Sequence, residues 1–317
     1  MIKKIFLIST LLVGCSQQNY QQAENIQLGT PILCEQYSGL PVNWSKATQA
    51  GMTFIQGGEF EIGNNYSYPE EKSVLKPKRK VNDFWIDRTE VTNAQFEAFV
   101  KATGYITQAE QQGDAAVFKP TTDTHELSWW KLVKGANWRH PNGSQDQTQI
   151  KPNEPVRMIT LSDAVAYADW LGRELPTEEQ WEYVAKLKLG NEGENTHQGV
   201  KYNIWHGEFP YENQGVDGYE GVAPVGCYAP NSAGLFDMIG NVWEYTKTPF
   251  VGNHDDHMGV SQISTHDKQS HNTYTIKGGS FLCASNYCQR YTATARHPQE
   301  VDLAISHVGF RTVINVK

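Results

Sequence analysis

The C-terminal part of this 317-residue chain lacks the hydrophobic periodicity of a long helix. From Gly190 to Lys317, more than a hundred residues are typical of turns and short strands. Stretches of this length without long regular elements are uncommon inside compact domains. Something other than secondary structure must therefore hold this half of the chain together.

The overall composition permits a folded core and excludes several classes of protein. Hydrophobic residues make up 39% and aromatic residues 11% of the chain, which is too many for a disordered protein and too few for a polytopic membrane protein. The formal net charge of −8 argues against a nucleic-acid partner, which would need a basic surface. No repeat or linker is evident between Met52 and Lys317, so we expect one large, turn-rich α+β domain with little regular secondary structure.

The first residues carry an export signal. Two lysines precede the apolar run Ile5–Val13, which is too short to span a bilayer. Leu12–Cys15 resembles the bacterial lipobox and implies lipidation of Cys15, although an ordinary secretory signal is the alternative. We therefore expect an exported lipoprotein of the outer membrane, facing the periplasm and held to the membrane by its lipid alone. The expected parts are a signal peptide at 1–14, a tether at 15–47 and a folded domain at 48–317.

Capping boxes mark two expected helices. Thr92 is followed three positions later by Gln95, and Thr177 by Gln180, each ahead of apolar residues at helical spacing. A third helix is expected from Ser162. The expected strands are Met52–Ile55, Glu59–Ile62 and Asp83–Asp87, with a hairpin through Gly57–Gly58 and a surface loop over Asn64–Lys80.

Cys283 and Cys288 lie close together in a segment that begins with Gly278 and Gly279. Two thiolates cannot complete a tetrahedral zinc site, and no Cys–His pair stands nearby at zinc-finger spacing. Two-coordinate Cu(I), which prefers soft sulfur ligands, is compatible with the pair. A structural disulfide is equally natural in an exported protein, and the spacing alone favours it.

Two clusters between the third helix and the cysteine pair are rich in oxygen donors. Asn203–Trp205 is followed by Asp217–Gly221, and Asp237–Glu244 forms the second cluster. Such residues in Gly-rich turns suit a hard cation such as calcium, although they also form ordinary Asx turns. Bound calcium would explain how the turn-rich half stays ordered. A His-rich run at 254–271 is more typical of a solvated loop than of a metal site.

Several blocks together resemble the formylglycine-generating enzyme (sulfatase-modifying factor) family over about Met52–Val313. The Trp129–Pro141 block and the cysteine pair resemble the generating enzymes themselves. The blocks that resemble the wider superfamily are Phe54–Phe60, Glu90–Asn93, Arg173–Glu178, Asn203–Trp205, Gly240–Glu244, Gly278–Ser280 and Gly309–Arg311. The resemblance implies that family's fold, which has a C-type-lectin-like core.

The resemblance also implies a copper-dependent oxidase. Members of the family use dioxygen and Cu(I) to convert a cysteine in a Cys-x-Pro-x-Arg segment of an unfolded sulfatase polypeptide to Cα-formylglycine. Carried over to this chain, Cys283 and Cys288 would hold the copper, and Ser280 would lie near the reacting centre. Trp129 and Arg290 would lie close to the substrate groove.

Two Ca(II) sites follow from the same resemblance, and they coincide with the two oxygen-rich clusters. Their residues would be Asn203, Ile204, Asp217 and Tyr219 in the first site, and Asp237, Gly240, Val242 and Glu244 in the second.

The chain departs from the animal members of the family at several positions. His307 stands where those members have Asn close to the active centre, so we expect it at the substrate pocket. Ala293 and Thr312 stand where two of their disulfide cysteines would be expected. Cys34 and Cys227 are left over, and we expect them to form a disulfide with each other.

Two other functions compete with the oxidase. A non-catalytic binding or structural lipoprotein would share the fold, but such proteins generally lack the cysteine pair. A non-haem iron sulfoxide synthase would need a His-rich partner domain, for which this chain has no room. The cysteine pair therefore favours the copper oxidase.

Overall fold

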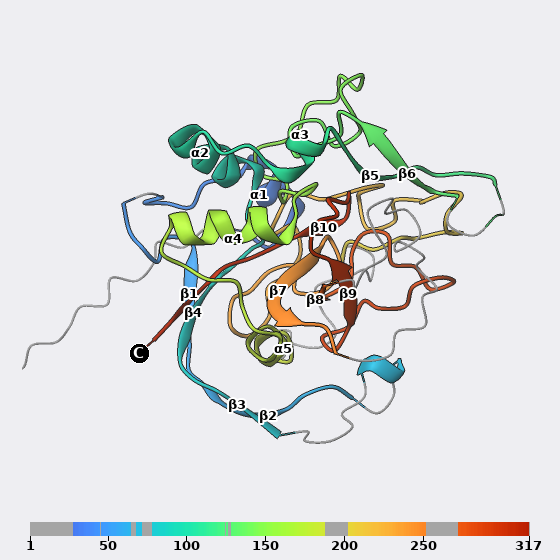
Figure 1. Ribbon diagram of the computed structural model, residues 1–317. Helices are drawn as coiled ribbons and strands as arrows, with labels where there is room; N and C mark the ends of the chain where they lie inside the picture. The colour runs from blue at the N-terminus through green and yellow to red at the C-terminus, as the bar shows by residue number, and fades with distance from the viewer. Residues whose placement is uncertain are drawn as a thin grey trace, which may run out of the picture.

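A computed structural model describes residues 28–44, 46–64, 68–71, 78–123, 125, 128–187, 202–251 and 272–316. The expected signal peptide, the expected lipidation at Cys15 and the His-rich run at 254–271 lie outside these residues. Within the described ranges, no helix combines the length and the apolar character needed to cross a bilayer. Short helices and strands are joined by long turns (Figure 1).

The N-terminal strands form one long antiparallel ribbon that is interrupted in its middle (Figure 1). The predicted hairpin between the first two strands is wrong, because they follow one another along the same side of this ribbon. Ile55 pairs with Phe84 and Gly58 with Val81, so the register continues across the break. There the Gly57 N–H donates to an Asp83 carboxylate oxygen at 2.8 Å. The paired strands are β1 (Met52–Ile55) with β4 (Phe84–Asp87), and β2 (Gly58–Glu61) with β3 (Lys78–Val81); β11 (Val313–Asn315) also pairs with β4.

The predicted surface loop over Asn64–Lys80 is wrong in two respects. Its last residues form strand β3. The 3-10 turn η1 (Pro69–Glu71) carries two buried carboxylates, Glu70 and Glu71. A polar sequence suggested exposure to solvent, but these side chains find partners in the C-terminal half of the chain.

The predicted capping boxes begin helices in the structure. Thr92 caps α2 (Asn93–Thr103), and Thr177 caps α5 (Glu178–Ala185). The helix expected from Ser162 begins one residue earlier, because Thr160 and Asp163 form its capping box. That helix is α4 (Leu161–Trp170), and two short helices were not predicted: α1 (Pro31–Gln36) and α3 (Gln108–Gln112).

The turn-rich half is organised around a four-stranded sheet with the order β10-β7-β8-β9. Helix α5 packs against β7 and β8. No helix or strand occurs among the described residues of 202–242 and 278–295. The sheet consists of β7 (Trp243–Pro249), β8 (Thr273–Lys277), β9 (Arg296–Glu300) and β10 (Val308–Gly309), and a separate ribbon pairs β5 (Asp114–Phe118) with β6 (Trp130–Lys134).

A buried ion pair ties the two halves of the chain together. The Arg311 guanidinium donates to both carboxylate oxygens of Glu244, at 2.6 and 2.7 Å. The Trp181 indole of α5 donates to the same carboxylate at 2.8 Å, and Arg311 also donates to the Asp87 carbonyl of β4 at 3.2 Å. Since removal of either charged partner would leave a buried charge without its counterion, this junction constrains β4, α5 and β7 together.

Cys34 and Cys227 form a disulfide that joins α1 to the turn-rich half. Close by, the Asn153 side chain donates to the Cys34 carbonyl at 2.7 Å, and the Gly29 N–H donates to the Gly226 carbonyl at 2.7 Å. The final part of the expected tether is therefore packed on the folded domain. A covalent link of this kind is typical of exported proteins.

Candidate active site at a buried cysteine pair

Cys283 and Cys288 face each other in the interior of the turn-rich half. Their sulfur atoms are 3.4 Å apart, and both cysteines are free thiols. The two residues are only 1% and 2% exposed. The structural disulfide that the spacing favours is not formed, and the two sulfurs remain available as ligands.

The segment that begins at Gly278 positions Cys283 through short backbone contacts. The Cys283 N–H donates to the Ser280 carbonyl at 2.9 Å, and its carbonyl accepts the Trp205 N–H at 2.9 Å. The N–H of the fully buried Ser280 points at the Cys283 sulfur at 3.4 Å. Gly279 has φ +81°, and a Cβ there would lie 2.3 Å from the Arg290 carbonyl. Glycine is therefore required for the two parts of the site to approach each other.

The two thiols differ in acidity. A hydrogen bond from the Cys283 thiol, assisted by the backbone N–H and the charge of Arg290, lowers the pKa of Cys288 to about 7. Burial, together with the neighbouring sulfur, raises the pKa of Cys283. Near neutral pH, Cys288 can therefore carry a thiolate, which is the form of cysteine that binds metals.

An aromatic wall stands beside Cys288. The Tyr287 ring stacks on Phe209 with centroids 4.4 Å apart, and it meets the Trp129 ring edge-on at 5.4 Å. Trp205 meets Phe209 at 5.2 Å. Because Tyr287 directly precedes Cys288, the structure brings the predicted groove residue Trp129 to within one side chain of the cysteine pair.

Arg290 also lies beside the pair, but its charge is already matched. Its Nε and Nη2 atoms donate to Glu70 Oε1 at 2.9 and 2.5 Å. The Tyr68 ring centroid lies 3.8 Å from the guanidinium carbon. Arg290 is only 4% exposed, so its guanidinium is held by Glu70 and is not open to an anionic ligand from solution.

His307 lies against Trp130 of β6, with ring centroids 5.0 Å apart. It is 3% exposed, and its Nδ1 is buried without a hydrogen-bond partner. Burial lowers the pKa of His307 to about 3, so the imidazole is neutral at physiological pH. His307 therefore packs on Trp130, the residue that follows the predicted groove residue Trp129.

The first oxygen-rich cluster contains an unsatisfied buried acceptor. The Asn203 side-chain nitrogen donates to the Gly221 carbonyl at 2.9 Å, whereas its Oδ1 is buried without a partner. The buried Asp217 carboxylate accepts the N–H groups of Ile204 and Tyr219, each at 3.0 Å. Burial raises the pKa of Asp217. An orphaned amide oxygen on a segment that binds a buried carboxylate fits a hard cation.

The second cluster differs from its prediction in one respect. The Glu244 carboxylate is occupied by Arg311 and Trp181, and Asp237 accepts the Gly226 N–H at 2.5 Å. Burial raises the pKa of Asp237 to about 6. Among the described residues, no three His, Cys, Asp or Glu side chains form a ready ligand set, so a cation here would also need backbone carbonyls such as those predicted at Gly240 and Val242.

Glu90 is a further buried carboxylate near this second cluster, although the three carboxylates do not converge into one ligand set. It is fully buried, its Oε1 accepts the Asn241 side-chain N–H at 3.0 Å, and its Oε2 has no partner. Burial, with the charges of Asp237 and Glu244, raises the pKa of Glu90 well above its usual value. Asn241 also accepts a hydrogen bond from Asn203 at 3.0 Å, so one amide connects the two clusters.

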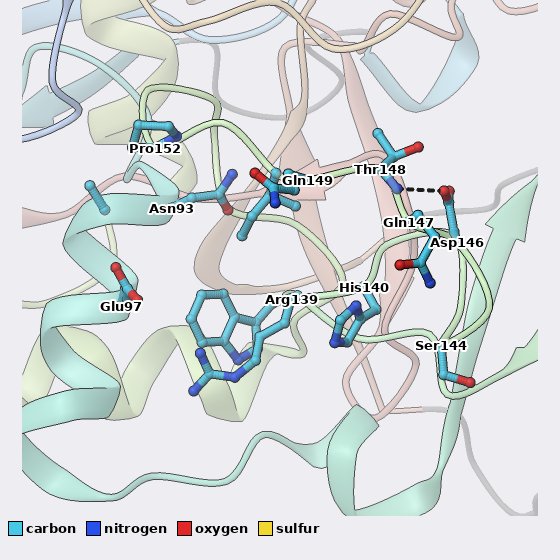
Figure 2. Close-up of a pocket in the computed structure, with 13 residues that line it drawn as sticks. Asn93, Glu97, Arg139, His140, Ser144, Asp146, Gln147, Thr148, Gln149 and Pro152 are labelled. Atoms are coloured by element: carbon cyan, nitrogen blue, oxygen red, sulfur yellow. Dashed lines mark hydrogen bonds between the residues drawn. The ribbon is translucent and has the colours of Figure 1, made fainter.

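A polar pocket of about 580 Å³ lies between the start of α2 and the loop over 138–152 (Figure 2). Arg139 lies over the Trp138 ring at 4.1 Å, and the Thr148 N–H donates to Asp146 at 2.8 Å. The residues that line this pocket include none of the predicted site residues. The cysteine pair is thus a separate feature of the molecule.

Sequence reasoning missed three residues that the structure adds to these sites. Glu90 could have been noticed, because it is an acidic residue two positions before Thr92, the expected helix cap. In the structure both residues are fully buried. Tyr68 and Glu70 left none, because they lie in a polar run more than 200 residues before Arg290. Contacts over such a separation cannot be found from local patterns.

Comparisons with known proteins agree with this fold. Residues 38–316 match the sulfatase-modifying factor enzyme 1-like domain. The chain is 40% identical over 288 residues to the formylglycine-generating enzyme of Mycobacterium tuberculosis (strain ATCC 25618 / H37Rv), covering 82% of this chain and 96% of that protein. It is also 32% identical over 292 residues to the inactive C-alpha-formylglycine-generating enzyme 2 of Bos taurus, covering 86% and 91%.

The solved structure of PvdO from Pseudomonas aeruginosa has the same fold, with a TM-score of 0.57 and 21% identity over 85% of this chain and 96% of that one. Fold and site together thus define a single turn-rich α+β domain of the formylglycine-generating type. This chain belongs to the sulfatase-modifying factor family.

Proposed function

We propose that this protein is a formylglycine-generating oxidoreductase of sulfatase maturation. Its reaction converts a cysteine in a Cys-x-Pro-x-Arg segment of an unfolded sulfatase polypeptide to Cα-formylglycine, with dioxygen as the oxidant. The observation that carries the proposal is the buried pair of free thiols at 3.4 Å, in a chain that is 40% identical to a formylglycine-generating enzyme.

The cysteine pair fits Cu(I) as the resident metal. Cys283 and Cys288 offer two soft sulfur ligands in a site from which water is largely excluded. When bound there, copper would supply the one-electron chemistry that dioxygen requires. On metal binding at neutral pH, Cys283 would release its proton, because its pKa is raised, whereas Cys288 is already partly ionised with a pKa of about 7.

The surrounding residues would bind and orient the substrate segment. The aromatic wall of Trp129, Phe209 and Tyr287 presents apolar surface beside Cys288 and limits access of water. Ser280 is fully buried beside Cys283, where its N–H steadies the sulfur. Arg290 helps to shape the site while its charge stays with Glu70.

The two oxygen-rich clusters are proposed as calcium sites that hold the turn-rich half together. The orphaned Asn203 Oδ1 with the Asp217 carboxylate supports the first site. The orphaned Glu90 Oε2 beside Asp237 supports the second site. There Glu90 would replace Glu244 as a calcium ligand, because the Glu244 carboxylate is bound to Arg311. Both sites combine a charged oxygen with neutral ones, as calcium prefers.

An anchored location outside the cytoplasm is the third part of the proposal. The lipobox at Leu12–Cys15 would place the domain at the outer membrane, facing the periplasm and held by lipid alone. The disulfide between Cys34 and Cys227 supports an oxidising compartment. In that setting, the client sulfatases would be exported unfolded before they are modified.

The decisive experiment follows the substrate cysteine by mass spectrometry. Full-length protein in detergent is loaded with Cu(I) and incubated in air with a Cys-x-Pro-x-Arg peptide. We expect conversion of the peptide cysteine to the aldehyde, and its loss in both Cys283→Ser and Cys288→Ser. The Cys34→Ser/Cys227→Ser variant is the matched control, because it removes two cysteines outside the site and should keep turnover. No conversion by metal-loaded wild-type protein would instead assign the chain to the non-catalytic binding modules.

A further inference from the structure

The turn η1 and the residue before it lie across the segment that carries Cys288. Tyr68 Oη accepts the Gln289 N–H at 3.3 Å, and Glu70 accepts two hydrogen bonds from Arg290. The backbone carbonyl of Glu70 accepts a hydrogen bond from Arg296 of β9 at 3.1 Å. Residues more than 200 positions apart in sequence are therefore joined directly next to one of the two thiols.

The two cysteines are held in different ways. Cys283 is fixed by neighbours within its own loop and by Trp205, through backbone hydrogen bonds of 2.9 Å. The segment from Cys288 to Arg290 contacts its own loop through the Gln289 side chain and the Arg290 carbonyl, and it is tied in addition to Tyr68 and Glu70. The place of the Cys288 sulfur thus depends on a part of the chain that lies outside the cysteine loop.

The contact with Glu70 is a buried ion pair rather than a surface one. The side chains of Arg290 and Glu70 are 5% and 3% exposed. Loss of one partner would leave the other charge in a low-dielectric environment, where it would turn toward water or toward another charge. Glu70 binds the edge of the guanidinium and Tyr68 covers one of its faces, with the ring centroid 3.8 Å away, so the arginine has one defined orientation.

We propose that Tyr68 and Glu70 are positioning residues of the cysteine pair, which hold Arg290 and the backbone from Cys288 to Arg290 so that the Cys288 thiol stays buried opposite Cys283. This inference rests on the proposed function for its meaning, since a metal site needs both sulfurs at a fixed distance. It assigns a role to the segment Tyr68–Glu71, which lies far from the two proposed metal ligands in the sequence.

The test measures thiol reactivity before it measures activity. Full-length protein without metal is treated with iodoacetamide, and mass spectrometry follows the modification of Cys283 and Cys288 separately. The variants are Glu70→Gln, which removes the charge, and Tyr68→Phe, which removes the acceptor for Gln289 but keeps the ring. Glu71→Gln is the matched control, because Glu71 is a buried carboxylate of the same turn that contacts Thr294 instead of Arg290.

We expect Cys288 to react about tenfold faster in Glu70→Gln and about threefold faster in Tyr68→Phe. The effect is larger in Glu70→Gln because a hydrogen bond to a charged group contributes more free energy than one between neutral groups. In Glu71→Gln its rate should stay within about twofold of wild type. The affinity for Cu(I), measured by competition with a chromophoric chelator, should fall in the same order. The positioning role would be overturned if Cys288 reacted at the same rate in all three variants. It would also be overturned if Glu71→Gln raised the Cys288 rate or lowered the Cu(I) affinity as much as Glu70→Gln does.

Failure of the two proposals is distinguishable. If wild-type protein neither binds Cu(I) nor converts the peptide, the proposed function fails, while the alkylation rates still report on the position of Cys288. If wild-type protein is active and Glu70→Gln matches it in reactivity, copper affinity and the KM and kcat for the peptide, the positioning inference fails alone. Tyr68→Phe keeps the test open should Glu70→Gln not fold, because it leaves every buried charge paired.

Discussion

At the scale of single residues, the site is defined by buried polar groups whose partners differ sharply. Arg311, Glu244 and Arg290 are buried and fully paired, so they stabilise the fold around the site. Asn203 and Glu90 each keep one oxygen without a partner. An unpaired buried oxygen is costly unless an ion or water satisfies it, and this contrast separates structural residues from candidate ligands.

His307 provides a test of burial at this scale. Its pKa is lowered to about 3, whereas an unfolded chain has a histidine near its usual value of about 6.5. Between these values the unfolded state binds a proton that the native state does not, so stability is lost as the pH falls below about 6.5. We expect His307→Asn to lose less free energy of unfolding than wild type from pH 7 to pH 5, by up to about 1.4 kcal/mol per pH unit.

Urea unfolding at a series of pH values measures this difference. His125→Asn is the matched control, because it makes the same substitution at a histidine whose side chain is 90% exposed. Parallel pH profiles for wild type and His307→Asn would show that the imidazole is not buried in its neutral form.

At the scale of elements, helix starts could be predicted from local sequence, whereas the pairing of strands could not. The capping boxes at Thr92 and Thr177 identified α2 and α5, because a helix start is encoded within four residues. The hairpin through Gly57–Gly58 was wrong, since two glycines between strand-like runs also permit a continuous ribbon. Which strand lies opposite depends on the distant β3 and β4, and no local pattern contains that information.

The disulfide between α1 and the turn-rich half permits a prediction at this scale. Its cysteines are 193 residues apart, so the bond removes considerable freedom from the unfolded chain. We expect Cys34→Ser/Cys227→Ser to lower the free energy of unfolding by about 2–4 kcal/mol. Guanidinium unfolding with and without a reductant measures the effect. Reductant should destabilise wild type and leave the double variant unchanged; the same stability in both proteins without reductant would contradict the prediction.

At the scale of the whole molecule, the sequence predicted residues that could form the site, but it did not predict how distant parts of the chain assemble around them. The cysteine pair and the two oxygen-rich clusters were recognisable, because ligand types and short spacings are local. Glu90, Tyr68 and Glu70 were not, because each reaches its site from a different part of the chain. The hydrogen bond from Cys283 that lowers the pKa of Cys288, and the burial that keeps His307 neutral, likewise arise only in the complete fold.

Calcium should stabilise the molecule as a whole, since both proposed sites lie in the turn-rich half. Calcium at about 100 times its dissociation constant adds about 2.7 kcal/mol per site, which corresponds to a rise in Tm of about 5 °C or more. We expect this rise in wild type after removal of metal, and a reduced rise in Asp217→Asn and Glu90→Gln. Asp123→Asn, which alters an exposed carboxylate, is the control. A melting temperature independent of calcium would contradict both sites.

The disulfide between Cys34 and Cys227 also closes the chain between them into a covalent ring. A protease that cuts a single peptide bond anywhere inside this ring opens it without releasing a fragment. The C-terminal piece with the cysteine pair then remains bonded, through Cys227 and Cys34, to the segment that precedes α1. A nicked molecule therefore stays in one piece, and its parts separate only when that bond is reduced.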